Sequence, residues 1–363
     1  MNNIRCNVEI QPLTCVHVGD GEKLRLNMDS YKDKKNIYVL DLDKLAAHIK
    51  LFKEDGTVDR GEFARLESRI IHSDVSSLIS NGASNKISEN VLSSLCERVI
   101  EIRGSLSSDD IFILTQIKDA FGRPFLPGSS IKGAIRTAVL APLALAELEN
   151  KGKKHDEAGM EKQLFRRDKN DLTTDYFRFL RISDAYFSQK DLGAVKIRAL
   201  NEPAPNKQKR NALEVIASEV NSEFHLSVDW DKLNLFCGGD VPKHLDFMLD
   251  PNKLFNHVNE NTLDLLDYDV DFIKRNDLIG NSGELIDKYE DFINKAKEWC
   301  KQCKPGECVL RLGMGIGKTY TTGMWATETN KNTAKTRAYY TTDDKGKTID
   351  LLGFVKLRIK SVK

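Results

Sequence analysis

Short runs of β-branched and aromatic residues recur along the chain between polar turn residues, a pattern typical of strands. Residues 7–18 (NVEIQPLTCVHV) are partly alternating and end at the turn His17-Val18-Gly19-Asp20-Gly21. Further strands are predicted at residues 36–40, 111–117, 177–183 and 194–199, at two segments between 213 and 228, and at 308–312 and 351–359. The predicted strands therefore occur in both halves of the chain.

Apolar residues at helical spacing predict helices between these strands. Residues 41–52 begin with a possible N-cap at Asp41 or Asp43, and residues 129–149 are amphipathic and rich in Ala and Leu. Two longer segments, 59–103 and 241–302, are also predicted to be largely helical, whereas the polar segment 151–174 is expected to form a mobile loop. Strands followed by helices in both halves indicate an α+β fold with antiparallel sheets.

The length of the chain favours two domains. At 363 residues it exceeds the size at which a single hydrophobic core usually stops growing. The composition changes near Asn211, which predicts one domain over residues 1–212 and a second over 213–363. Each domain is expected to carry a helical insertion, at about residues 55–105 in the first and 241–302 in the second.

Composition indicates a soluble cytoplasmic protein. Hydrophobic residues at 40% and charged residues at 30% are ordinary for a globular chain. No run approaches the roughly 20 apolar residues of a membrane span, and the first residues lack the apolar core of a signal peptide. The 7 Cys are an odd number and lie mostly inside apolar segments, which fits reduced thiols in a cytosol. We therefore expect no membrane partner.

Charge is unevenly distributed along the chain. The formal net charge of +1 does not by itself indicate a nucleic-acid binder. Lys and Arg are concentrated in residues 195–210, 330–347 and 354–363, however, whereas Asp and Glu dominate residues 259–291. Such asymmetry lets one surface attract phosphate while another repels it, although solvated helix faces give the same pattern.

The segment 127–140 (PGSSIKGAIRTAVL) combines a Gly-rich loop with the start of a helix. Gly128 lets the chain turn, and Ser129 or Ser130 suits the N-cap position of the helix that follows. The first turn of a helix presents unpaired N–H groups and a partial positive charge, which favour a phosphate. The segment therefore predicts an anion-binding helix start, while an ordinary capped helix is the alternative.

Two cations follow in the same helix. Lys132 and Arg136 are four residues apart and share one face, where they can contact phosphates. Gly133 costs about 1 kcal/mol relative to Ala in a helix, which suggests that another backbone approaches it closely. A second face is apolar and is expected to pack toward a sheet (Ile131, Ile135 and Val139).

A second Gly-rich segment, residues 310–322 (LRLGMGIGKTYTT), resembles a nucleotide-binding P-loop only superficially. The P-loop motif that ends at Lys318-Thr319 requires Gly at position 312, which is Leu. Gly313, Gly315 and Gly317 instead predict a flexible edge without side chains. Lys318 and the hydroxyls of the neighbouring threonines can contact a sugar–phosphate backbone there, although a plain Gly-rich hairpin turn is the alternative.

Few residues suggest catalysis or metal binding. His17 is a candidate for a structural hydrogen bond, for an RNA contact, or for a general base that activates a ribose 2′-hydroxyl, and the first two are favoured because no partner is evident. Asp184 is a strand-end carboxylate, usually a cap or turn residue. Cys300, Cys303 and Cys308 lack a fourth ligand for a closed zinc site. We expect no metal and no cofactor.

Several segments together resemble the RAMP superfamily of CRISPR proteins, and more specifically the fifth subunits of type III-A Csm effector complexes. Residues 13–21 are similar to the family's opening strand and its His-x-Gly-x-Gly turn, and residues 38–42 to the following aliphatic strand. Residues 125–137 match the Pro-Gly-Ser-Ser-x-Lys-Gly-x-x-Arg element. Residues 180–184 resemble the family's Arg-x-Ser-Asp strand, and residues 310–317 its C-terminal Gly-rich loop, except that Lys318 follows Gly317 directly.

This resemblance implies two ferredoxin-like (RRM-like) domains with helical insertions. It also implies a non-catalytic subunit that binds crRNA, caps the filament near the crRNA 3′ end and supports crRNA maturation in antiviral defence. The implied partners are crRNA, the other Csm subunits, especially the backbone RAMP subunit, and a recruited host nuclease. A metal-independent endoribonuclease that acts on CRISPR RNA, with His17 as general base, is the alternative.

Overall fold

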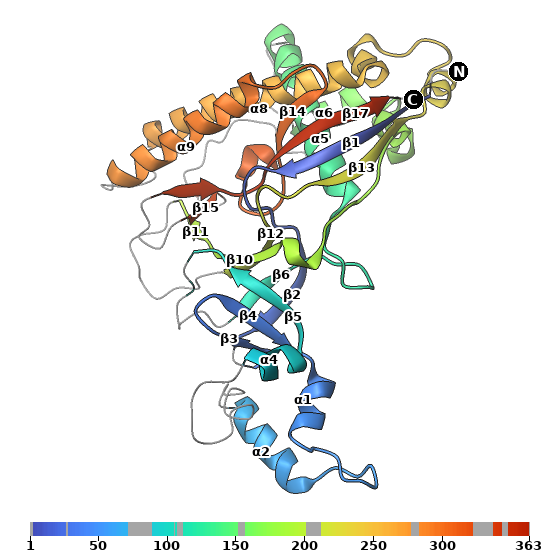
Figure 1. Cartoon of the computed structure of the whole chain (residues 1–363). Helices are drawn as coiled ribbons and strands as arrows, with labels where there is room; N and C mark the ends of the chain where they lie inside the picture. The colour runs from blue at the N-terminus through green and yellow to red at the C-terminus, as the bar shows by residue number, and fades with distance from the viewer. Residues whose placement is uncertain are drawn as a thin grey trace.

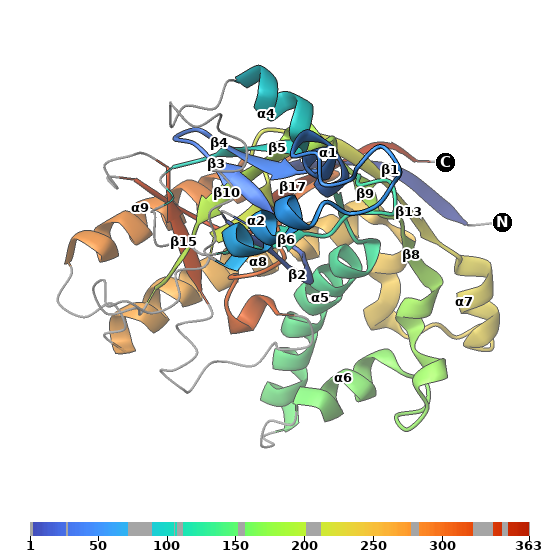
Figure 2. The same ribbon diagram turned by 90° about the horizontal axis from the view of Figure 1, so that it is seen from below.

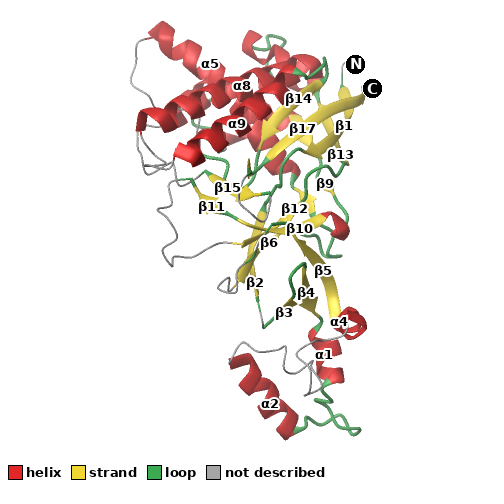
Figure 3. Ribbon diagram, turned by 60° about the vertical axis from the view of Figure 1, so that its left-hand side comes forward, coloured by secondary structure: helices red, strands yellow, loops and turns green. Residues whose placement is uncertain are grey.

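The computed structural model describes residues 3–26, 28–71, 89–104, 106, 112–151, 157–200, 212–276, 283–321, 337–342 and 348–362. Two large sheets lie one above the other in an elongated molecule (Figure 1). Helices gather around the upper sheet, and α1 and α2 lie at the opposite end of the molecule (Figure 3). The fold is thus mixed α/β, with strands and helices in both halves of the chain.

The upper sheet has five strands and is antiparallel throughout, as predicted. Its order is β14 (Glu307–Arg311), β17 (Phe354–Val362), β1 (Ile4–Pro12), β13 (Ser222–Val228) and β8 (Leu180–Ile182). Alternate residues of β1 are buried, which fits a strand with one face on the core. The predicted strand 7–18 was too long, because β1 ends at Pro12 and residues 13 and 14 turn to bond the Phe354 carbonyl.

Three long helices accompany this sheet: α5 (Gly128–Lys151), α8 (Pro251–Asn276) and α9 (Gly283–Lys301). In Figure 2 α5 is seen along its length, with α6 beside it. Helix α8 covers the edge strand β14. Asn259 accepts a bond from the Val309 N–H at 3.0 Å, and Thr262 donates to the Val309 carbonyl at 2.8 Å. These bonds satisfy backbone groups that an open sheet edge would expose.

The lower sheet has seven strands. Its order is β2 (Gly19–Arg25), β6 (Phe112–Gln116), β12 (Ala212–Ile216), β10 (Leu192–Lys196), β5 (Cys96–Ile102), β4 (Asn36–Leu40) and β3 (Ser30–Lys32). Two of its pairings, β6 with β12 and β5 with β10, are parallel, and the others are antiparallel. The segment 59–103 was predicted to be largely helical, which is wrong at β5, because this strand pairs with β4 on one side and with β10 on the other.

The shorter elements complete the fold. The helices are α1 (Leu42–His48), α2 (Arg60–Ile71), α4 (Glu89–Leu95), α6 (Glu157–Phe165) and α7 (Trp230–Phe236). The 3₁₀ turns are η1 (Leu172–Thr174), η2 (Tyr176–Phe179), η3 (Gln189–Asp191), η4 (Lys243–Leu249) and η5 (Lys318–Tyr320). Small sheets pair β7 (Phe125–Leu126) with β9 (Ala185–Tyr186), and β11 (Arg198–Ala199) with β15 (Ala338–Thr341) and β16 (Ile349–Leu351).

The sequence predictions have different outcomes in these elements. The Asp41 side chain caps α1, as predicted. Helix α6 lies inside 151–174, which was predicted to be a loop, and the basic segment 201–210 lies outside the described residues. The predicted boundary at 212/213 does not separate the sheets, because β1 from the first part pairs with β13 and β17 from the second. Among the described helices, none is long and apolar enough to cross a membrane.

Candidate nucleic-acid interface

Helix α5 begins in close contact with the turn that follows β8. A Cβ atom on Gly128 would lie 2.2 Å from the Ile182 carbonyl oxygen, so only glycine fits there. The Gly128 N–H donates to Oδ1 of Asp184 at 2.7 Å, which makes Asp184 the cap of this helix. Ser129 and Ser130 lie inside the first turn, so the predicted serine N-cap was wrong. The anion at this helix end is the protein's own carboxylate.

The predicted phosphate-binding cations have different surroundings. The Arg136 guanidinium is bound by both oxygens of Asp175, at 2.9 and 2.7 Å, and by Glu161 at 2.7 Å. It also lies over the rings of Phe165 and Phe177, 4.9 and 4.8 Å from their centroids. Burial disfavours its charge, but the bonds to the two carboxylates outweigh burial and raise the pKa of Arg136. The assignment of Arg136 to phosphate is therefore corrected: it joins α5 to α6 and η2.

Lys132 remains accessible. It is half-buried, and among the described residues it has no ion pair within 4.0 Å. Burial lowers the pKa of Lys132, Asp175 opposes this, and Arg136 and Arg181 act in the same direction as burial. An external anion near such a cation stabilises its charged form. The apolar face of α5 packs as predicted, with Ile131, Ile135 and Val139 buried.

His17 is built into the fold. Its side chain is only 2% exposed, and its Nδ1 lies 2.6 Å from the Glu214 carbonyl oxygen. A Cβ atom on Gly19 would approach its Nε2 to 2.9 Å, so the glycine makes room for the ring. Burial lowers the pKa of His17, against the hydrogen bond and charge of Glu214 and the charge of Asp20. The imidazole is thus held neutral, which supports the structural role.

Glu214 is a residue that the sequence analysis missed. It lies fully buried in β12, where one carboxylate oxygen accepts from Lys118 and from the Gln116 N–H, and the other faces Arg98 at 3.3 Å. This network fixes the strand that carries the bond to His17. The signal was a single carboxylate inside an otherwise apolar run, ALEVI.

The C-terminal Gly-rich loop packs on the His17 turn. Gly313, Gly315 and Gly317 all have left-handed φ angles, of 97°, 77° and 93°. The Met314 N–H donates to the His17 carbonyl at 2.8 Å, and a Cβ atom on Gly313 would lie 2.5 Å from that oxygen. The Gly315 carbonyl accepts from Ala338 at 2.8 Å. The predicted flexible edge is therefore wrong: backbone bonds hold this loop to the His17 turn and to Ala338.

The residues after this loop differ in accessibility. Lys318 opens η5 and is partly exposed, whereas Thr319 is buried and Thr321 is exposed. Thr319 is thus not available to a ligand. Thr322 lies outside the described residues.

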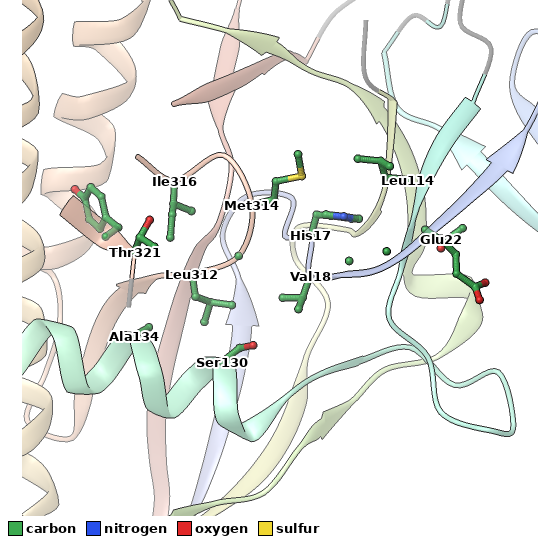
Figure 4. Close-up of a pocket in the computed structure, with 15 residues that line it drawn as sticks. His17, Val18, Glu22, Leu114, Ser130, Ala134, Leu312, Met314, Ile316 and Thr321 are labelled. Carbon is green, nitrogen blue, oxygen red and sulfur yellow. The ribbon is translucent and has the colours of Figure 1, made fainter. Parts of the chain in front are cut away.

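A cavity of about 440 Å³ lies where these segments meet. The His17 turn, the first turns of α5 and the Gly-rich loop all contribute to its wall, and β6 closes one side. Figure 4 shows Ser130 and Ala134 below, Leu312 and Met314 in the centre, and Glu22 with its carboxylate turned away from the other labelled side chains. Of the predicted residues, the cavity is lined by His17, Ser130 and Gly313. Sequence reasoning missed Met314, Thr115 and Tyr320.

The positions of the remaining predicted α5 residues relative to this cavity follow from the geometry of the helix. At 3.6 residues per turn, Ser130 and Ala134 lie on one flank of α5 and Lys132 on the opposite flank. Ser129 and Gly133 fall between them on the solvent side, where Ser129 is exposed and Gly133 partly exposed. Within the first two turns of α5, the described residues between the cavity and Lys132 are therefore the small Ser129 and Gly133.

The thiols carry no sign of a reactive centre. Burial raises the pKa of Cys300 to about 12 and that of Cys308 as well. In the part of the chain that is described, no three His, Cys, Asp or Glu side chains are grouped to hold a metal ion.

Comparison with known proteins decides the family. A family model described as the RAMP superfamily matches residues 9–319. The chain belongs to the RAMP superfamily. Among curated proteins, this RAMP chain is similar to the Streptococcus thermophilus "CRISPR system Cms protein Csm5", at 33% identity over 132 residues. That match spans 35% of this chain and 36% of the Csm5 protein.

Two solved structures have the same fold as this RAMP protein. The crystal structure of T. onnurineus Csm5 has a TM-score of 0.64 at 18% identity and covers 96% of this chain and 99% of its own. A chain in the cryo-EM structure of a Csm-crRNA-target RNA ternary complex has a TM-score of 0.64 at 17% identity, with 97% and 100% covered. The predicted resemblance is confirmed: this is a Csm5-like RAMP protein. The two ferredoxin-like domains stay a prediction.

Proposed function

We propose that this RAMP protein is a non-catalytic crRNA-binding subunit of a type III-A Csm complex. It caps the filament near the crRNA 3′ end and supports crRNA maturation, with the other Csm subunits, the backbone RAMP subunit in particular, and a recruited nuclease as partners. The observation that most directly supports this proposal is a shared cavity. Three segments far apart in the sequence line it, namely the His17 turn, the start of α5 and the 312–316 loop. The likeness to Csm5 and to a chain of a crRNA complex supports the same proposal.

The RNA strand crosses the first two turns of α5. Ser129 and Gly133 carry little side-chain volume, so a sugar–phosphate backbone can lie close to the helix there. The hydroxyl of Ser130 and the backbone of the Gly-rich loop contact it on the cavity side, and Lys132 contacts a phosphate on the other flank. Contacts of this kind involve the backbone rather than base edges, so binding is tolerant of sequence and weakens as salt rises.

The non-catalytic assignment is supported by His17. A general base has to reach the proton that it removes. The imidazole is 2% exposed, and its Nδ1 is already bonded to the Glu214 carbonyl. No feature of this site favours the endoribonuclease alternative.

The role of Lys132 can be measured through the salt dependence of binding. We expect Lys132→Ala to remove one phosphate contact, so the slope of log K against log salt should fall in magnitude by about 0.7 for a single strand. The measurement is fluorescence anisotropy of labelled crRNA with the purified protein between low and physiological salt. Lys301→Ala, at the far end of α9, is the matched control. An unchanged slope in the Lys132 variant would remove this contact from the proposal.

The path over α5 is tested by adding volume without changing charge. We expect Gly133→Leu to weaken crRNA binding at least about tenfold, because the new side chain occupies the route between the cavity and Lys132. Its melting temperature should not fall, since Leu is a better helix former than Gly by about 1 kcal/mol. A variant that melts normally and binds crRNA like the wild type would show that the strand runs elsewhere.

A further inference from the structure

The hairpin between β6 and β7 carries an unusual exposed aromatic side chain. Phe121 at its tip is 83% exposed, the most exposed large hydrophobic side chain in the described part of the chain. In Figure 4 the chain that precedes α5 loops away from the helix before it returns to it. An aromatic ring presented to solvent in this way needs a physical explanation, because burying it would be favourable by itself.

The tip is rigid rather than loosely placed. Oδ1 of Asp119 accepts from the N–H groups of Phe121 and Arg123, both at 2.9 Å, and Oδ2 accepts from Nε of Arg123 at 2.8 Å. The Gly122 N–H bonds back to the Asp119 carbonyl at 3.0 Å. Gly122 has a left-handed φ of 74°, which suits the tight turn. The backbone that carries the ring is therefore fixed.

The Arg123 guanidinium and two further aromatic rings lie behind Phe121. The Arg123 guanidinium lies 5.8 Å from the Phe121 centroid and 4.8 Å from that of Tyr186. Tyr186 in turn lies 5.5 Å from the ring of Phe125. One face of Phe121 is thus supported by a cation–π contact, while the rest of the ring is open to solvent.

We propose that Phe121 is a stacking platform for one unpaired nucleobase of the bound RNA strand. Aromatic side chains bind unstacked bases in this way, and every base has a π-face, so the contact is tolerant of sequence. The hairpin joins two parts of the cavity wall, since β6 provides Thr115 before it and α5 provides Ser130 after it. A strand that leaves the cavity along this side meets the ring. This inference rests on the proposed RNA-binding function.

The surroundings favour a base over a protein surface. A protein partner usually requires a contiguous apolar patch of several hundred Å². Around Phe121, however, the neighbours that contact the tip are Arg123, whose guanidinium lies over both this ring and that of Tyr186, and Gln189, which donates to the Gly122 carbonyl. Tyr186 is itself 42% exposed, so the exposed apolar groups are two rings with a charged group over both. Two rings with a guanidinium over both do not make a contiguous apolar patch of that size, and the outer ring, Phe121, suits a single planar ligand.

The test uses single-stranded RNA with one 2-aminopurine, whose fluorescence is quenched by stacking, placed at successive positions along a series of probes. We expect one position to be quenched on binding to the full-length protein. Phe121→Leu, which keeps an apolar side chain but no ring, should restore the fluorescence and weaken binding about tenfold. Phe121→Trp should keep the quenching. Leu172→Ala, another strongly exposed apolar residue, should behave like the wild type.

The outcomes separate this inference from the function on which it rests. If the wild-type protein fails to bind the RNA, the proposed function fails. If it binds but no position is quenched, or if Phe121→Leu keeps the quenching, the platform is wrong and RNA binding stands. If Phe121→Leu leaves RNA binding intact but releases another Csm subunit from the assembled complex, the ring is a protein contact and the inference is overturned.

Discussion

Replacing Gly128 by alanine should destabilise the protein by about 3 kcal/mol or more, because overpacking against backbone atoms cannot be relieved by a rotamer change. The new Cβ would lie 2.2 Å from the Ile182 carbonyl oxygen and 2.8 Å from its carbon. Relief requires that α5 moves away from the turn after β8, and such a movement also breaks the bond from the Gly128 N–H to Asp184. Urea denaturation followed by circular dichroism measures the loss.

Gly283 provides a matched control for this substitution. It also opens a helix, α9, but a Cβ atom there would meet nothing within 4 Å. Gly283→Ala should therefore leave the free energy of unfolding unchanged or raise it by up to about 1 kcal/mol. Equal losses in the two variants would mean that the helix start, and not the contact with β8, requires glycine.

Arg136→Ala is expected to destabilise the protein by about 3 kcal/mol. The substitution leaves Asp175 and Glu161 without their cation in a site where the three side chains are only 13 to 24% exposed. Removing one partner of such a pair leaves the remaining charge without a counter-charge, which costs more than the pair itself contributes. The rings of Phe165 and Phe177 also lose their contacts with the guanidinium. Chemical denaturation measures this change.

Two comparisons show whether this loss comes from the buried network. Arg136→Lys should recover only part of the stability, since an ammonium cannot make the two parallel bonds to Asp175. Arg65→Ala removes a half-exposed pair with Glu62 and should cost less than about 1 kcal/mol. At a temperature where the Arg136→Ala protein is folded, the salt dependence of crRNA binding should match the wild type. A reduced salt slope there would return Arg136 to the RNA contacts.

Strong local patterns predicted much of the fold. The run NIYVL gave β4 at its observed limits, and the segment 241–302, predicted to be largely helical, contains α8 and α9. Failures occurred where tertiary pairing overrode local signals. CERVIEI was included in a predicted helix, yet it forms β5 because β4 and β10 pair with it on either side. Helix α6 was missed because its short polar sequence has a weak helical pattern of its own.

The site was predicted as segments but not as contacts. The three segments of the cavity wall could be found from their glycines, His17 and the Pro-Gly-Ser-Ser element. The hydrogen bonds between these segments could not be predicted, because the His17 carbonyl accepts from Met314, which lies near the other end of the sequence. The role of Arg136 was misassigned for the same reason. Glu161 comes from the segment 151–174, which was predicted to be a loop, and Asp175 directly follows it. Periodicity does not show that these two carboxylates come back to contact α5.

The central strands of the upper sheet have a consequence for the synthesis of the protein. Strand β17 lies between β1 and β14, so β1 has one of its two neighbours missing until residues 354–362 have been made. A β1–β13 pair alone would leave one long edge open, and closing the loop to β17 spans nearly the whole chain. Pairings of such high sequence separation form slowly. The nascent protein should therefore depend on chaperone protection, and its core should form late rather than domain by domain as synthesis proceeds.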